Sequence, residues 1–170
     1  MGGSVMNPKT RCILRYLFVV FLGVTLFFAY SLSGSNLIVG LFAPVNNSVW
    51  ETLKLIFFPL LALTLWDLFT CYRNTASFLP ARTLGILAGL AFYVVSYYSI
   101  FGIIGTPIFW VAIIIYLTTI AYVFLVEQLV CGRRGLTTTL AIVVLIALII
   151  LFIVFTLVPP ALGIFVPVVV

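Results

Sequence analysis

Apolar residues occur along the chain in five long segments, separated by short stretches rich in Gly, Pro, Ser, Asn and Arg. A helix needs about 20 apolar residues to cross the hydrocarbon layer of a bilayer, where it satisfies its own backbone hydrogen bonds. Each of the five segments has about this length. The sequence therefore predicts an all-α membrane protein, a single integral membrane domain over residues 1–170 with spans at about 12–31, 51–71, 83–104, 107–127 and 137–158.

The composition narrows the class of protein. The chain of 170 residues is 65% hydrophobic and 6% charged, with a mean hydropathy of +1.41. Soluble domains carry roughly 25% charged residues and cannot bury this much apolar surface in one core. The composition excludes a soluble enzyme, a nucleic-acid-binding protein and a disordered segment. We expect a multi-pass protein of the cell membrane whose partners are membrane lipids, with no nucleic acid.

The basic residues are divided unequally between the two ends of the predicted spans. Seven of the eight lie before the first span, between the second and third, or between the fourth and fifth. Because cytoplasmic loops carry an excess of Lys and Arg, five alternating spans place the N-terminus inside and the C-terminus outside. The seven are Lys9, Arg11, Arg15, Arg73, Arg82, Arg133 and Arg134, and Lys54 alone belongs to the outer side.

The connection between the first two spans contains an apolar stretch, residues 37–44, that is too short to cross a bilayer. We expect the segment at about 36–47 to be interfacial, with Leu and Phe side chains anchored in the membrane surface. The alternative is a re-entrant segment, which is rarer because irregular backbone at membrane depth must find polar partners.

The densest group of polar residues follows directly, at 46–54. Ser48 and Glu51 have the spacing of a capping box at the start of a helix, and Lys54 would pair with Glu51 or reach the interface. The alternative is a polar ligand site, on which side chains from other spans must converge because buried charges need partners. The candidate ligand-binding residues are Asn46, Asn47, Trp50, Glu51, Lys54, Tyr97 and Tyr98.

Other residues within the spans predict helix packing. Pro59 leaves a backbone carbonyl without its helical donor and is expected to kink the second span. Gly85 and Gly89 are spaced as a close-packing face for another helix, either inside the subunit or across a homo- or hetero-oligomer.

Groups able to carry out chemistry are scarce. The chain has no histidine, and its three cysteines lack the spacing of a metal site, so we expect neither a metal nor a cofactor. Asp67 is expected to face Arg73 or Arg82 near the inner surface, with a proton relay as the alternative role. The cysteines are Cys12, Cys71 and Cys131.

Residues 44–54, PVNNSVWETLK, resemble a family of small bacterial integral membrane proteins of unknown function with the signature Pro-Val-Asn-Glu-Ser-Val-Trp-Glu-His-Leu-Lys. The resemblance implies a shared five-helix fold and no established activity. This chain has Asn47 where the pattern has Glu and Thr52 where it has His. It also has Ala161 where a His is expected after the double proline. If the family performs acid–base or metal chemistry there, this member has lost it.

Three functional classes fit these features. The first is a small binding or transport-associated protein with an outward-facing polar site at the start of the second span. The second is a structural or assembly subunit without a ligand site, held by the face of Gly85 and Gly89. The third is a membrane enzyme, active or inactive, that uses Glu51 as a base. With one carboxylate and no histidine at the site, the sequence leans away from an enzyme.

Overall fold

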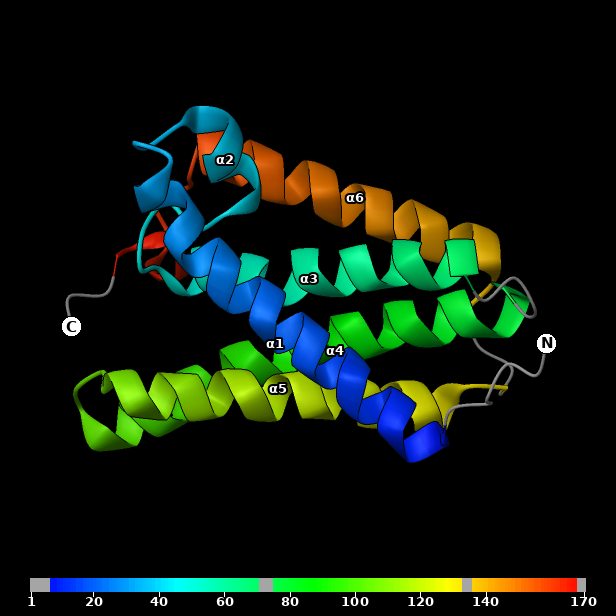
Figure 1. Cartoon of the computed structure of the whole chain (residues 1–170). Helices are drawn as coiled ribbons and strands as arrows, with labels where there is room; N and C mark the ends of the chain where they lie inside the picture. Colours follow the sequence, from blue (N-terminus) through cyan, green and yellow to red (C-terminus); the bar gives the residue numbers. More distant parts are fainter. Residues whose placement is uncertain (1–6, 71–74, 133–135, 168–170) are drawn as a thin grey trace.

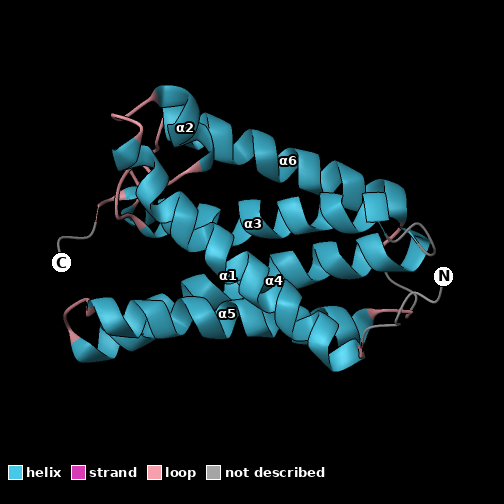
Figure 2. Ribbon diagram, viewed as in Figure 1, coloured by secondary structure: helices cyan, strands magenta, loops and turns pink. Residues whose placement is uncertain are grey.

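The computed structural model describes residues 7–70, 75–132 and 136–167, and all regular structure within them is helical. Five of the helices are long and apolar enough to cross a membrane, which confirms the predicted all-α class with five candidate spans (Figures 1 and 2). The elements are α1 (Pro8–Leu32), α2 (Leu37–Phe42), α3 (Val49–Thr70), α4 (Thr75–Ile104), α5 (Phe109–Val130), α6 (Thr138–Leu157) and the 3-10 helix η1 (Gly163–Phe165).

The helix α4 begins earlier than the sequence predicts. The third span was expected to start at residue 83, after Pro80, but α4 runs from Thr75 through Pro80 to Ile104. Proline is tolerated inside membrane helices because neighbouring groups satisfy the carbonyl that it frees. Arg82 therefore lies within the helix, where it is fully buried, and not in the connection. The predicted connecting residues 71–74 lie outside the described part of the chain.

The helix α3 lies in the middle of the bundle. In Figure 1, α4 and α5 form an antiparallel hairpin, and α1 crosses the bundle obliquely over α3. The helix α6 packs against α4. Most of α3 is buried, whereas less than a third of each of the other four spans is buried. The four outer spans therefore shield α3, which carries two of the three acidic residues.

The short helix α2 folds back onto the bundle beside the first turns of α3 (Figure 1). Asn36 begins it, because the Asn36 side-chain oxygen accepts a hydrogen bond from the Ile38 N–H at 2.9 Å. Gly40 permits close packing, since a Cβ there would lie 2.9 Å from Val45 and 3.1 Å from Tyr30 of α1. The segment expected at 36–47 is thus a helical turn held against the bundle, and its interfacial or re-entrant position stays a prediction.

Two glycines bring α4 and α5 together. A Cβ on Gly85 would lie 2.9 Å from the backbone oxygen of Val123, and a Cβ on Gly89 would overlap a Val123 methyl group. The glycine face predicted from the sequence therefore contacts a helix of the same chain, which is the first of the two arrangements left open. Close backbone approach through small residues is a general means of packing membrane helices.

Candidate functional site

The start of α3 is fixed by side chains of the preceding loop. The Ser48 hydroxyl accepts a hydrogen bond from the Glu51 N–H at 3.2 Å, as expected for a helix cap, while the Asn46 side chain accepts from the Ser48 N–H at 2.9 Å. The capping box is only half formed, because the Glu51 carboxylate does not accept a hydrogen bond from the Ser48 N–H. It instead accepts from the Val45 N–H at 2.8 Å.

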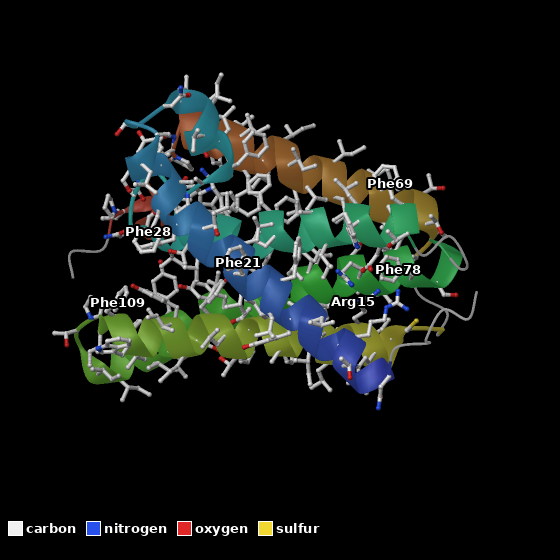
Figure 3. The ribbon with its side chains drawn as sticks, viewed as in Figure 1. Arg15, Phe21, Phe28, Phe69, Phe78 and Phe109 are labelled. Atoms are coloured by element: carbon white, nitrogen blue, oxygen red, sulfur yellow. The ribbon has the colours of Figure 1, made fainter. Side chains whose placement is uncertain are left out.

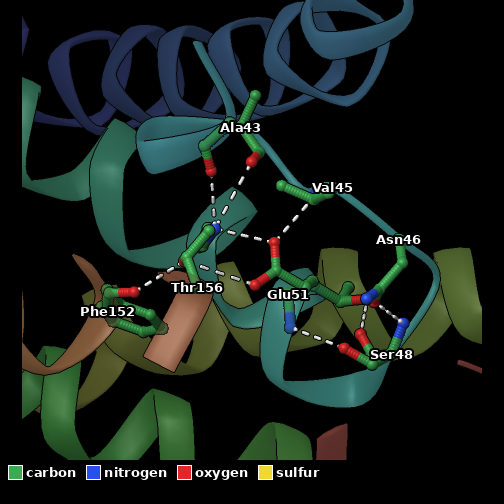
Figure 4. Close-up of polar contacts among 10 residues, drawn as sticks. Ala43, Val45, Asn46, Ser48, Glu51, Phe152 and Thr156 are labelled. Atoms are coloured by element: carbon green, nitrogen blue, oxygen red, sulfur yellow. Dashed lines mark hydrogen bonds and ion pairs between the residues drawn. The ribbon is translucent and has the colours of Figure 1, made fainter. Parts of the chain in front are cut away.

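Glu51 and Lys54 form a buried ion pair (Figure 4). The Lys54 ammonium lies 2.7 Å from a Glu51 carboxylate oxygen, and the Lys54 side chain has an exposed fraction of 0%. The second Glu51 oxygen faces the Thr156 hydroxyl of α6 at 3.5 Å, although this hydroxyl also donates to the Phe152 carbonyl at 2.7 Å. The pair is therefore enclosed between α3, α6 and the loop that follows α2.

Lys54 also binds the C-terminal end of α2. Its ammonium donates to the Gly40 carbonyl at 2.8 Å and approaches the Ala43 carbonyl at 3.5 Å. The last carbonyls of a helix lack intrahelical partners and carry partial negative charge, so a cation there is stabilising. Together with Glu51, the three donors of the ammonium have acceptors. This arrangement ties α2 to the first turn of α3.

Trp50 lies in an aromatic cluster on the same side of α3. Its ring centroid is 4.9 Å from that of Phe152, 5.3 Å from Phe155 and 5.0 Å from Phe165 of η1. The indole N–H is buried without a hydrogen-bond partner among the described residues. The cluster holds the end of α6 and the C-terminal segment against α3, as offset and edge-to-face aromatic pairs do in protein cores.

The opposite side of the start of α3 lines a cavity of about 550 Å³. It lies between the C-terminal half of α1, the N-terminal half of α5, and residues of α3 and α4. In Figure 3, Phe28 of α1 and Phe109 of α5 stand at its two sides. Its polar lining residues are Asn47, Thr52, Tyr93, Tyr97 and Tyr116, and the rest of the wall is almost entirely apolar.

Tyr116 marks the place where α1, α3 and α5 meet in the wall of this cavity. Its hydroxyl donates to the Leu55 carbonyl at 3.3 Å. This carbonyl is the one that Pro59, four residues later, leaves without a helical N–H donor. Gly23 of α1 makes room for the hydroxyl, because a Cβ there would overlap it. The carbonyl that the sequence expected Pro59 to release is thus bound by a side chain of α5.

The structure divides the predicted site residues between the two sides of α3. Asn47 and Tyr97 line the cavity, and Tyr97 stacks on the buried Tyr93 with ring centroids 6.0 Å apart. Tyr98 is half exposed and touches Tyr97 edge to face. The remaining predicted residues, Asn46, Trp50, Glu51 and Lys54, do not line the cavity. Thr52, Tyr93 and Tyr116 join it without having been predicted as site residues.

A second group of charged residues lies at the other end of the bundle. Arg82 is fully buried and binds Glu127 of α5 through two nitrogens, at 2.7 and 3.2 Å. It also contacts one oxygen of Asp67 at 3.2 Å, while Arg15 of α1 binds the other oxygen at 2.6 Å. The Arg82 guanidinium faces the rings of Phe78 and Phe124. The predicted contact between Asp67 and Arg82 is confirmed, and Arg15 and Glu127 were not foreseen.

This ionic group has no feature of a metal site. Within the described ranges, no three His, Cys, Asp or Glu side chains lie close enough to hold a metal ion together. Of the three cysteines, Cys12 and Cys131 are free, and Cys71 lies outside the described residues. One Arg82 nitrogen has no hydrogen-bond partner among the described residues, and the guanidinium lies over the rings of Phe78 and Phe124. Cation–π contacts of this kind stabilise a buried arginine, so we interpret this group as structural.

Five apolar helices that close around buried ion pairs define a polytopic membrane protein of the helical-bundle class. Residues 3–170 match a family described as a family of unknown function (DUF6512), and the chain belongs to that family. The match extends over the whole bundle and does not test the signature expected at residues 44–54. No curated protein and no solved structure matches the chain.

Proposed function

We propose that the chain is a small binding protein of the cell membrane, which holds an amphipathic, lipid-like molecule between α1, α3, α4 and α5. The observation that carries this proposal is the cavity of about 550 Å³ at the start of α3. Ligand sites have volumes of about 300–1,000 Å³, are mostly apolar and contain a few polar groups that fix orientation. The cavity has each of these properties.

The two walls of the cavity differ in polarity, which indicates the class of ligand. Asn47 and Thr52 of the α3 start and Tyr97 of α4 offer amide and hydroxyl groups on one side. The facing side, formed by α1 and α5, is apolar apart from Tyr116, and its phenylalanines are Phe27, Phe28 and Phe109. A polar head beside the first wall keeps its hydrogen bonds, which would be costly to lose in an apolar environment. A hydrocarbon chain matches the second wall.

The rim of the cavity supports access from the hydrocarbon layer. Phe28 and Phe109 are 53% and 50% exposed, and they lie where α1 and α5 diverge (Figures 1 and 3). A water-soluble ligand would have no need of an opening bounded by exposed aromatic side chains. A molecule already dissolved in the bilayer reaches such an opening by lateral diffusion.

In this proposal Asn47 and Tyr97 touch the ligand, whereas Glu51 and Lys54 support the site from behind. The ion pair fixes the connection that leads into α3, and Asn47 lies in that connection. The distribution of basic residues supports an orientation with the N-terminus inside, which places the cavity toward the outer leaflet.

Photolabelling with a diazirine-bearing palmitic acid tests the proposal. Purified protein in detergent micelles is irradiated with the probe, and labelled peptides are mapped by mass spectrometry. We expect labels within residues 20–28 and 107–117, which line the cavity. Ala112→Phe fills the cavity and should reduce labelling at least fivefold. Ala91→Phe makes the same change at an exposed position of α4 outside the cavity and should leave labelling unchanged.

A second variant keeps the test decisive if Ala112→Phe does not fold. Thr52→Val replaces a hydroxyl with a methyl group and keeps nearly the same side-chain shape. It should therefore weaken labelling by the acid more than labelling by a diazirine alkane of equal length. Uniform labelling of all lipid-facing helices, unaffected by Ala112→Phe or by Thr52→Val, would overturn the proposed binding function.

A further inference from the structure

A second cavity lies between α1 and α3 at the end of the bundle opposite the first. Its volume is about 330 Å³. It lies between the first half of α1 and the last turns of α3. The residues that matter for its chemistry are Arg11, Arg15, Trp66, Asp67 and Thr70. It shares no lining residue with the larger cavity, so it is a separate place on the molecule.

The acidic residues of the chain are few, and they are used in ion pairs. The chain has only three acidic residues, and one of them, Glu51, is paired with Lys54 at the other end of the bundle. The other two, Asp67 and Glu127, are also paired: Asp67 binds Arg15 and Arg82, and Glu127 binds Arg82. All three carboxylates of the chain are therefore engaged in ion pairs, while two arginines line this cavity.

The spacing of the two arginines on α1 concentrates this charge at the cavity. Arg11 and Arg15 are four residues apart on α1, and both line the cavity. Two such positions lie about 5–6 Å apart at Cβ, so the two guanidinium groups give this part of the cavity a positive potential. Asp67 is already shared between Arg15 and Arg82. A ligand anion in the cavity would lie beside both arginines.

Arg15 is the member of the buried ionic network that reaches the surface. Its side chain is 24% exposed, compared with 0% for Arg82, 5% for Asp67 and 11% for Glu127. Its bond to Asp67 uses one guanidinium nitrogen. A guanidinium has five N–H donors in a planar fork that suits phosphate oxygens, so it can bind Asp67 and a phosphate together.

The remaining wall of the cavity is apolar, and much of it is exposed. Leu14 and Phe18 of α1 and Trp66 of α3 are 49%, 43% and 64% exposed, and all three line the cavity. Arginines next to an exposed apolar groove complement a phospholipid, which has a phosphate headgroup and apolar acyl chains. From this juxtaposition we propose that the α1/α3 cavity binds the phosphate headgroup of an anionic phospholipid, with an acyl chain along Leu14, Phe18 and Trp66.

Lipid-dependent quenching of Trp66 tests this site. The protein is reconstituted into vesicles of phosphatidylcholine that contain, at equal mole fraction, either brominated phosphatidylglycerol or brominated phosphatidylcholine. Trp110→Phe leaves Trp66 as the exposed tryptophan, and Trp66→Phe leaves Trp110, which is 71% exposed near the other end. We expect several-fold stronger quenching by the anionic lipid in the first protein. We expect equal quenching by the two lipids in the second.

Arginine variants then distinguish a specific lipid-binding site from non-specific attraction of anionic lipid to a basic surface. A basic residue near an anionic membrane surface changes lipid binding by about fivefold, so Arg11→Gln should reduce the preference for the anionic lipid by about this factor. Arg11→Lys should keep most of it. Arg133→Gln removes one charge from the connection between α5 and α6 and should leave the preference unchanged.

Three results would overturn the proposal. The first is equal quenching of Trp66 by both lipids. The second is an equal loss with Arg11→Gln and Arg133→Gln, which would indicate surface potential only. The third is loss of the preference on adding inorganic phosphate but not sulfate of equal ionic strength, because the ligand would then be a soluble phosphate. None of these results bears on the larger cavity.

Discussion

The Tyr116 hydroxyl donates a hydrogen bond to the carbonyl oxygen of Leu55 at 3.3 Å, across the boundary between α5 and α3. Pro59 has no N–H, so this oxygen has no donor within its own helix. An unpaired backbone carbonyl is costly in an apolar environment. A tyrosine from another helix therefore makes a proline tolerable in the most buried span.

The contribution of Tyr116 should depend on the identity of residue 59. Tyr116→Phe should lower the free energy of unfolding by about 1 kcal/mol, the usual value for a neutral hydrogen bond. In a Pro59→Ala background the new N–H can bind the Leu55 carbonyl, so the same substitution should cost less. Unfolding in mixed detergent micelles measures both differences.

Tyr16→Phe provides the control for this comparison. The Tyr16 hydroxyl donates to the Leu117 carbonyl at 3.2 Å, and no proline follows Leu117 at the fourth position. Its cost should be the same with Pro59 as with Ala at position 59. An equal cost of Tyr116→Phe in both backgrounds would contradict the link between Pro59 and Tyr116.

Breaking the ion pair between Glu51 and Lys54 should strongly destabilise the protein. Lys54→Met leaves a buried carboxylate without its cation, and loss of one partner of a buried pair costs about 3–5 kcal/mol. The double variant Glu51→Gln, Lys54→Met should recover part of this loss because no uncompensated charge remains. The free energies of unfolding of Lys54→Met, Glu51→Gln and the double variant test this, and an additive double variant would argue against the pairing.

The four charged residues at the other end should differ in their contributions. Glu127→Gln removes the carboxylate that binds two nitrogens of the buried Arg82 and should cost about 3 kcal/mol. Arg15→Gln removes a partly exposed partner and should cost about 1 kcal/mol or less. The ratio of the two losses is the measurement, and equal losses would contradict the assigned burial.

Gly85 and Gly89 face different parts of Val123, so their alanine variants should respond differently to one rescue substitution. Overpacking of a close interface costs about 1–3 kcal/mol. Val123→Ala removes the methyl group that a Cβ at Gly89 would meet, and should restore Gly89→Ala. It leaves in place the backbone oxygen that a Cβ at Gly85 would meet, and should not restore Gly85→Ala. Thermal stability in detergent separates the two cases.

Cysteine labelling tests the proposed orientation. In a chain with Cys12 and Cys71 changed to Ser, the exposed Cys131 should resist a membrane-impermeant maleimide until cells are permeabilised. With Cys131 also replaced, Ser35→Cys in the connection between α1 and α2 should react in intact cells. Reaction at position 131 in intact cells would reverse the orientation.

Hydropathy predicts where this chain forms helices, and it predicts the rotation of those helices poorly. The spans in α3, α4 and α5 are apolar on all sides, so no apolar stripe shows which face is buried. The cap at Ser48 could be predicted because its partner is three residues away. The bond from Arg82 to Glu127 joins residues 45 positions apart and depends on how two helices are turned.

The candidate site was predicted in part for the same reason. Asn47 and Tyr97 were expected on chemical grounds and do line one cavity. Glu51 and Lys54, only a few residues further along, point to the other side of α3, since successive helical positions are rotated by about 100°. The sequence does not predict the early start of α4, because a proline usually ends a helix, whereas α4 continues through Pro80.

The enclosure of α3 has a consequence for biosynthesis. This span has the lowest hydropathy of the five, yet it is the most buried, and Trp50 and Glu51 at its start contact Phe152 and Thr156 near the end of α6. Charged side chains make a helix a poor substrate for insertion on its own. A nascent chain must therefore hold α3 beside the translocon or beside α1 until α6 has emerged. Ribosome-bound chains truncated before α6 should be recognised by quality-control proteases.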